Sequence, residues 1–231
     1  LSMREMLLAS KLLSEYMHYV INDKHDNVWI AQREGRAKDS NDRTQEAILK
    51  MMIMGGKGSV VDSLLDLHLV PLAISYEYDP CDFLKAQEFQ LKRDIPGWKK
   101  SAQDDIVSMQ TGIMGYKGHI HYHAAPCIDA WLRELPADTP KADIFRIIAE
   151  HIDREIHAHY QLFPSNFVAL DMLQGNAAHA DKYSAADKAQ FEKYLAGQLA
   201  KIQIENKDEA YLRECILKMY ANPAINQLAL A

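Results

Sequence analysis

Cysteine, glycine and proline are all scarce in this chain of 231 residues. The three cysteines, Cys81, Cys127 and Cys215, lie far apart and are odd in number, so they form no disulfide framework. Thiols of this kind are typical of a reducing compartment. Ten glycines and eight prolines supply few tight turns, which disfavours an all-β sandwich.

Long apolar runs and an excess of basic residues are also missing. No apolar run approaches the roughly 18 residues of a membrane-spanning helix, and no basic segment followed by an apolar one marks a signal peptide. The net charge is −6 and the pI is about 5.9, which leaves no basic stripe for nucleic acid. We therefore expect a cytoplasmic globular protein that does not bind nucleic acid.

Helical and strand patterns alternate in the first part of the chain. Short apolar runs rich in β-branched and aromatic residues predict buried strands at 28–31, 69–76 and 119–123. Helical spacing lies between them, including the ranges 83–93 and 102–114. The sequence therefore predicts an α/β domain over residues 1–136, a sheet flanked by helices.

Only helical patterns follow Pro136. Periodic apolar residues predict four helices, at 141–160, 165–174, 184–204 and 209–220. The segment 175–184 between two of them is expected to be a soft linker. We therefore predict an all-helical C-terminal region over residues 137–231.

Three alternating histidines lie on the last predicted strand. His119, His121 and His123 project from one face because side chains alternate along a strand. No cysteine or carboxylate at ligand spacing accompanies them, so we interpret them as structural or surface residues.

A second group of histidines follows on a predicted helix. Helical geometry pairs Asp153 with His157 on an exposed face and separates both from His151 and His159. His159 falls on the apolar side and is expected to face the core. No metal ion is therefore expected in this protein.

Two short motifs suggest chemistry at first sight. The segment 55–59, Gly-Gly-Lys-Gly-Ser, follows a helix and places a glycine after Lys57, so it departs from the phosphate-loop pattern and predicts a helix stop. His18 and Asp23 have the spacing of a general-base pair, but they end an amphipathic helix. We interpret their spacing as coincidence.

A basic polar stretch follows the first predicted strand. Arg33, Arg36 and Lys38 surround Glu34 and Gly35. Arginine binds phosphate oxygens in pairs, lysine adds a point charge, and glycine permits close approach of the backbone to a ligand. A solvated charged loop is the alternative. The stretch is a candidate phosphate site.

These residues carry a family resemblance. The segment 28–36, Val-Trp-Ile-Ala-Gln-Arg-Glu-Gly-Arg, resembles the third motif of the glycerolipid acyltransferases, in which a strand runs into Glu-Gly-x-Arg. The segment 69–77, Leu-Val-Pro-Leu-Ala-Ile-Ser-Tyr-Glu, looks like the fourth motif of the glycerol-3-phosphate acyltransferase branch. Lys117-Gly118 is similar to a pair that opens a later strand. In this sequence the arginine comes two residues after the glutamate, not three.

The resemblance implies an O-acyltransferase related to the glycerol-3-phosphate and 1-acylglycerol-3-phosphate enzymes of bacteria. Such an enzyme transfers a fatty acyl group from acyl-CoA or acyl carrier protein to a hydroxyl of a phosphorylated glycerol or lysolipid, without a cofactor or a metal. The acceptor site would contain Arg33, Glu34, Gly35, Arg36 and Lys38. Pro71 and Tyr76 would shape the acyl-donor side.

The catalytic motif of the family is expected outside this sequence. That motif, of the Asn-His-x-Ser-x-x-Asp type, lies well upstream of the third motif, so we expect the general-base His and its Asp upstream of Leu1. The chain by itself is then a C-terminal portion without activity. Peripheral contact with the inner face of the membrane is a further expectation.

Two other functions stay open at this point. One is a non-catalytic protein that binds a lipid or an acyl thioester but has no base. The other is a phosphoryl-transfer enzyme that uses the segment 55–59, for which Lys57 would be required.

Overall fold

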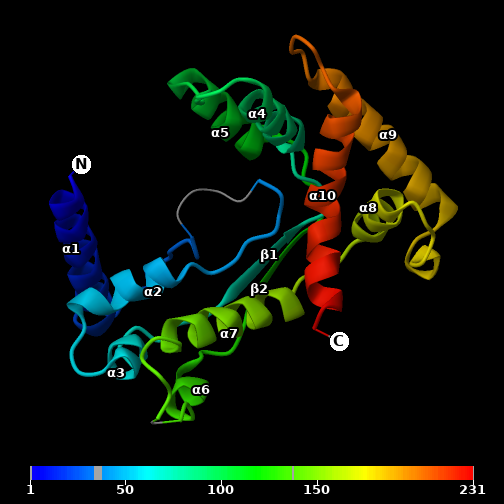
Figure 1. Cartoon of the computed structure of the whole chain (residues 1–231). Helices are drawn as coiled ribbons and strands as arrows, with labels where there is room; N and C mark the ends of the chain where they lie inside the picture. The colour runs from blue at the N-terminus through cyan, green and yellow to red at the C-terminus, as the bar shows by residue number, and fades with distance from the viewer. Residues whose placement is uncertain (1, 34–37, 137, 231) are drawn as a thin grey trace. The chain divides into compact units, whose positions relative to one another are not determined.

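The computed structural model describes residues 2–33, 38–136 and 138–230 of the chain (Figure 1). Helices account for most of the regular structure. In chain order the elements are α1 (Met3–Asn22), α2 (Glu46–Met52), η1 (Ile53–Gly55), α3 (Val60–Leu65), β1 (Leu72–Tyr76), α4 (Asp82–Asp94), α5 (Ala102–Met114), β2 (Ile120–Ala124), α6 (Asp129–Arg133), α7 (Ile144–Ala158), α8 (Pro164–Gln174), η2 (Ala180–Lys182), α9 (Ala185–Lys201) and α10 (Glu209–Leu228).

The chain forms two compact units, each assembled from separate stretches of sequence. Unit 1 comprises Leu1–Arg36, Asp42–Ala73 and His123–His159. Unit 2 comprises Ala37–Asn41, Ile74–Tyr122 and Tyr160–Ala231. The boundary expected after Pro136 lies within the sequence of unit 1, between α6 and α7.

The predicted α/β sheet is reduced to two antiparallel strands, β1 and β2. The predicted strand at 28–31 is wrong, because this segment is irregular and its Trp29 is 75% exposed. A strand is stable only when a neighbour satisfies its N–H and C=O groups. Within the described residues this segment belongs to no sheet, so the architecture is mostly helical instead of a helix-covered α/β sheet. The described part of residues 137–231 contains helices and no strand, as expected.

In unit 1, α1 packs closely against η1. The Ser14 hydroxyl donates to the Met52 carbonyl at 2.5 Å and accepts from the Gly55 N–H at 2.8 Å. Nε2 of His18 lies 3.1 Å from the same carbonyl, so this histidine has a packing role. A Cβ at Gly55 would lie 2.5 Å from the backbone nitrogen of Glu15. The glycines after α2 therefore end a helix at a close contact, as the sequence predicts.

The predicted exposed pair on α7 is buried instead. Asp153 is 8% exposed and His157 is 2% exposed. Oδ1 of Asp153 accepts from the Thr44 N–H at 2.8 Å and from its hydroxyl at 2.7 Å. Nδ1 of His157 lies 3.3 Å from a guanidinium nitrogen of Arg43. The segment before α2 covers this face of α7, and helical periodicity alone carries no information about such a cover.

In unit 2, α10 packs against α8, α4 and α9 (Figure 1). Its fully buried residues include Leu212, Ile216 and Ala224, and α9 adds Phe191 and Leu195. This apolar contact is the main core of the unit.

The helix α10 continues through Pro223, beyond the end that the sequence predicts at residue 220. Side-chain hydrogen bonds secure its last turns. Nδ2 of Asn222 donates to the Asp39 carbonyl at 2.7 Å, and Nε2 of Gln227 donates to the Tyr160 carbonyl at 2.9 Å. These tertiary contacts offset the backbone hydrogen bond that a proline cannot make.

The segment 175–184 is a structured connection and not the soft linker that the sequence suggests. Gly175 ends α8 in the left-handed conformation. Asp171, at 2% exposure, accepts from the N–H of His179, and its Oδ1 lies 2.8 Å from Nδ1 of that residue. The Tyr183 hydroxyl donates to Oδ2 of Asp171 at 2.8 Å. A single buried carboxylate thus fixes the connection onto α8.

Candidate functional site

The candidate phosphate-binding stretch lies only partly within the described residues. Glu34, Gly35 and Arg36 fall outside them. In unit 1, a guanidinium nitrogen of Arg33 lies 4.0 Å from Oδ1 of Asp42, and both side chains are about one-third exposed. An exposed pair at this distance contributes little to stability.

Lys38 is held by a buried carboxylate in unit 2. Its ammonium contacts Oε1 of Glu88, whose side chain is 7% exposed, and Nζ of Lys92 lies 2.9 Å from the same oxygen. Burial lowers the pKa of Lys38, although the contact with Glu88 acts in the opposite direction. Burial raises the pKa of Glu88, but the two lysines outweigh it and hold that pKa below its usual value. Lys38 therefore anchors its segment to α4.

The two predicted donor-side residues flank the strand β1. Pro71 is buried directly before it, and its carbonyl accepts from the Ala125 N–H at 2.9 Å. A proline is tolerated at this position because it precedes the ladder of the strand. Tyr76 ends the strand, and its hydroxyl lies 3.4 Å from that of Tyr122. The hydrogen bond to Tyr122, together with burial, raises the pKa of Tyr76 to about 12.

Two of the motif segments meet in unit 2, where β1 ends and β2 begins. The Glu77 N–H donates to the His119 carbonyl at 2.9 Å, and the Tyr78 N–H donates to the Lys117 carbonyl at 3.0 Å. Oε2 of Glu77 accepts from the His119 N–H at 2.9 Å and lies 2.6 Å from Nδ1 of the ring. Gly118 lies between them with a φ of +62°. The Tyr-Glu and Lys-Gly segments thus form one hydrogen-bonded turn.

Gly118→Ala is expected to lower the free energy of unfolding by about 2 kcal/mol. A positive φ costs an alanine roughly 1 kcal/mol, and the new Cβ would overlap the carboxylate of Glu77, which then loses its bonds to His119. Chemical denaturation measures the loss. Gly97→Ala is the matched control, since Gly97 has a φ of +76° but no atom within 4 Å of the added Cβ. Equal losses in the two variants would show that the Glu77 contact is irrelevant.

The alternating histidines have separate partners. His119 is bound to Glu77, whereas the ring of His123, in unit 1, stacks on that of His159 with centroids 4.0 Å apart. His151 stacks on Trp131 at 3.7 Å. Hydrogen bonding accounts for His119 and stacking for His123 and His151, which agrees with a structural interpretation of His119 and His123. His159 is half-buried against His123 and not in the core.

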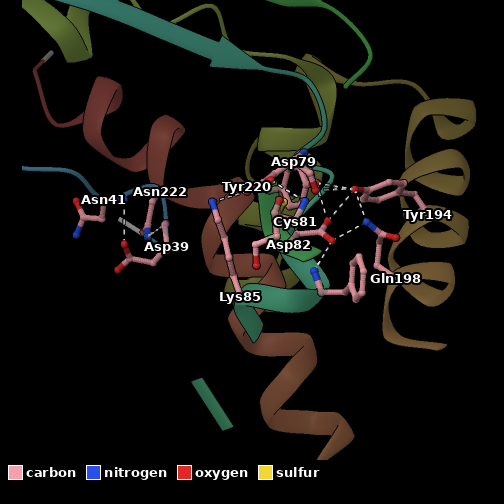
Figure 2. Close-up of polar contacts among 12 residues, drawn as sticks. Asp39, Asn41, Asp79, Cys81, Asp82, Lys85, Tyr194, Gln198, Tyr220 and Asn222 are labelled. Atoms are coloured by element: carbon pink, nitrogen blue, oxygen red, sulfur yellow. Dashed lines mark hydrogen bonds and ion pairs between the residues drawn. The ribbon is translucent and has the colours of Figure 1, made fainter. Parts of the chain in front are cut away.

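A buried carboxylate that sequence reasoning missed lies at the start of α4 (Figure 2). Asp82 is 0% exposed. Its Oδ2 accepts from the hydroxyls of Tyr194 and Tyr220, each at 2.8 Å, and its Oδ1 accepts from Nε2 of Gln198 at 2.6 Å. Tyr194 and Gln198 are four residues apart on α9, and two polar residues at this spacing beside Phe191 were the available signal for a buried partner.

The electrostatics of this cluster follow from its burial. Burial raises the pKa of Asp82 to about 6, against the effect of the two tyrosine hydroxyls, which lower it. Burial and the charge of Asp82 raise the pKa of Tyr194 and of Tyr220 far above the usual value. Asp79, close by, is paired with Lys85 at 2.6 Å. Asp82 can exchange a proton near neutral pH, but its 0% exposure leaves no room for a substrate, so its role is structural.

One group of residues in the described part of the chain could hold a metal ion. A ring nitrogen of His68, Sγ of Cys127 and a carboxylate oxygen of Asp129 all lie within 4.8 Å of one another in unit 1. His68 lies far in the chain from Cys127 and Asp129, so the sequence shows no ligand motif here.

In the ranges that the structure covers, every helix is too short or too polar to cross a membrane. Comparison of the chain with protein-family models, with curated proteins and with solved structures finds no match.

Proposed function

We propose that this chain forms the substrate-binding part of a glycerolipid O-acyltransferase. The acceptor is a phosphorylated glycerol or lysolipid, and the donor is an acyl thioester of CoA or acyl carrier protein. Arg33 and Arg36 hold the acceptor phosphate, whereas Lys38 is already paired with Glu88. The sequence resemblance suggests this assignment, and two features of unit 2 support it.

The turn formed by Glu77, Gly118 and His119 carries the proposal. In the resemblance, Tyr-Glu and Lys-Gly are separate motifs whose relation the sequence leaves undefined. In the structure one carboxylate joins them through two contacts with His119. Gly118 is the residue that leaves room for this carboxylate. The Tyr-Glu and Lys-Gly segments therefore form one turn, which is consistent with their belonging to one site.

An exposed apolar sheet face beside this turn suits an acyl thioester. Side chains alternate along a strand, so Tyr76 shares one face of β1 with Ile74, and Tyr122 shares one face of β2 with Ile120. Tyr76, Ile120 and Tyr122 are 41%, 46% and 58% exposed, and the two tyrosine hydroxyls are neighbours. An acyl chain or the pantetheine arm would cover this surface. Each Å² of apolar area removed from water contributes roughly 25 cal/mol to the free energy of binding.

The reaction removes a proton from the acceptor hydroxyl, whose oxygen attacks the thioester carbonyl and expels the thiol. The family resemblance implies a histidine base for this proton, and no residue of this chain is assigned to that role. The groups of this chain bind and orient the two substrates, which lowers the barrier by fixing the reacting atoms in position.

In a protein that contains this chain and transfers acyl groups, Arg36→Ala is expected to raise the KM for the phosphorylated acceptor about 10- to 100-fold, because a charged hydrogen bond is lost. The kcat should change little if the phosphate contact is equal in ground and transition states. Transfer of a radiolabelled acyl group to glycerol-3-phosphate or lysophosphatidate measures both. Arg213→Ala, on an exposed part of α10, is the control. Lys38→Ala is less informative, because it also removes an ion-pair partner of the buried Glu88.

Replacing both Tyr76 and Tyr122 by serine is expected to weaken binding of a long-chain acyl-CoA about 10-fold, because apolar area is lost from the sheet face. Isothermal titration of the 231-residue chain measures the affinity, and Ile113→Ser removes an apolar side chain that is 72% exposed elsewhere in unit 2. Equal affinity in both variants would contradict the proposed donor surface. Acyl-CoA binding that needs the two tyrosines, with no turnover by the full-length protein, would instead favour the non-catalytic binding protein.

A further inference from the structure

His68, Cys127 and Asp129 converge in unit 1 and take no part in the proposed acyl transfer. Nδ1 of His68 lies 2.7 Å from Oδ2 of Asp129, and Sγ of Cys127 lies within 4.8 Å of ligand atoms of both residues. His68 and Cys127 are exposed, while the Asp129 side chain is only 14% exposed. The group is therefore accessible from solvent on one side and fixed to the protein on the other.

Backbone pairing places the three side chains together. The antiparallel ladder continues past β1 and β2, with the Ala125 N–H donating to Pro71 and the Ile128 N–H donating to Leu69 at 3.0 Å. This register sets residue 68 opposite residues 127–129. Ile128, between the two ligand candidates, is 2% exposed, and Leu67, next to His68, is 4% exposed. Each candidate ligand thus follows or precedes a side chain anchored in the core.

The conformation of His68 also needs a reason. Its φ is +49°, a region that side-chain-bearing residues occupy seldom and that raises the energy by roughly 1 kcal/mol. A glycine would avoid this strain. The left-handed backbone turns the imidazole toward Asp129, where the 2.7 Å contact is made.

Asp129 retains an unused acceptor in this group. Its Oδ1 is buried and accepts no hydrogen bond from the described residues. Its Oδ2 already has His68 beside it and a guanidinium nitrogen of Arg133 at 4.0 Å. A buried carboxylate oxygen without a donor is costly, and a bound cation would satisfy it.

We propose that His68, Cys127 and Asp129 form a binding site for Zn²⁺ or a similar divalent transition-metal ion, with three protein ligands and a fourth position open to solvent. Nitrogen, thiolate sulfur and carboxylate oxygen are the three donor types that zinc accepts. Donor atoms around tetrahedral zinc lie roughly 3.3–3.8 Å apart. The His68–Asp129 pair, now 2.7 Å apart, would have to open, and Cys127, within 4.8 Å of both, would complete the group. On binding, the metal replaces the thiol proton of Cys127 and the hydrogen bond between His68 and Asp129.

The test is metal binding by the whole 231-residue chain and its variants. Equilibrium dialysis against Zn²⁺ is expected to give one tightly bound ion per chain, and Co²⁺ is expected to give a thiolate-to-metal absorption band. His68→Ala, Cys127→Ser and Asp129→Asn should each weaken Zn²⁺ binding at least about 10-fold, and Cys127→Ser should abolish the Co²⁺ band.

Two matched controls separate this site from adventitious binding. His25→Ala removes another exposed histidine with a left-handed backbone, at a φ of +57°, and Cys81→Ser removes a thiol of unit 2. Both should bind Zn²⁺ like the parent chain. Denaturation curves confirm that every variant is folded, which is expected because His68 and Cys127 are exposed. Zinc binding that is absent, or that the three ligand substitutions leave unchanged, would overturn the proposal. The result of this Zn²⁺-binding test does not depend on whether the chain takes part in acyl transfer.

Discussion

Asp82→Ala is expected to lower the free energy of unfolding by about 3 kcal/mol at neutral pH. The substitution removes the shared acceptor of Tyr194, Tyr220 and Gln198, and an unsatisfied buried donor costs about 1–3 kcal/mol. The sum is reduced because the two tyrosine hydroxyls, 3.0 Å apart, keep each other as partners. At neutral pH the substitution also removes the buried charge of Asp82, which offsets a further part of the loss in unfolding free energy.

Chemical denaturation at pH 7 and pH 5 measures the loss and tests its cause. At pH 5 the native carboxyl is mostly protonated, so the charge that the alanine removes is no longer present and the loss should be larger. Asp105→Ala is the control, because Asp105 is 60% exposed in the same unit and forms a surface ion pair with Lys100. A loss at Asp82 no larger than at Asp105 would show that the buried network contributes nothing.

Local patterns predicted the helices of unit 2 well. The predicted range 102–114 coincides with α5, and the predicted range 165–174 differs from α8 by one residue. Both helices begin at residues that restrict where a helix can start. Ser101 caps α5 through the N–H of Asp104, and Pro164 begins α8. Such signals lie within a few residues and are readable without tertiary structure.

The errors arose where a distant segment decides the local structure. The run 28–31 has the composition of a strand, but a strand also needs a neighbour, and composition says nothing about one. The opposite error occurred at Asp153, where the segment around Thr44 covers a face that periodicity predicts to be exposed. Burial on one helix is set by another part of the chain.

The candidate sites show the same division. Pro71 and Tyr76 could be identified because their neighbours in the sequence form a motif, and the structure places them at the two ends of β1. Asp82 is bound by side chains of α9 and α10, and His68 meets Cys127 through strand register. Tyr194 and Gln198 have a helical spacing that signals a buried partner, and Cys127 and Asp129 are two residues apart, but nothing in the sequence connects the first pair with Asp82 or the second with His68. Long-range pairing had to be known first.

The buried carboxyl of Asp82 is also expected to make unit 2 more stable as the pH falls. Its native pKa of about 6 lies above the ordinary value of 3.8, so the folded state binds the proton more tightly than the unfolded chain. The resulting stabilisation is fully present below pH 3.8 and is lost as the pH rises through about 6. The difference between these values corresponds to about 3 kcal/mol, at 1.36 kcal/mol for each pH unit.

Asp82→Asn isolates this contribution, since the amide is neutral at every pH and has nearly the same shape. The free energy of unfolding of the parent chain minus that of the variant should decrease by about 2 kcal/mol between pH 4 and pH 7, since the unfolded carboxyl is already partly ionised at pH 4. Other carboxyls, such as the hydrogen-bonded Asp171, have lowered pKa values and act in the opposite direction, but they occur in both proteins and cancel. Asp105→Asn serves as the exposed control. A difference that does not vary with pH would mean that Asp82 is ionised as readily inside the fold as in water. The tyrosine hydroxyls and Gln198 would then fully compensate its burial.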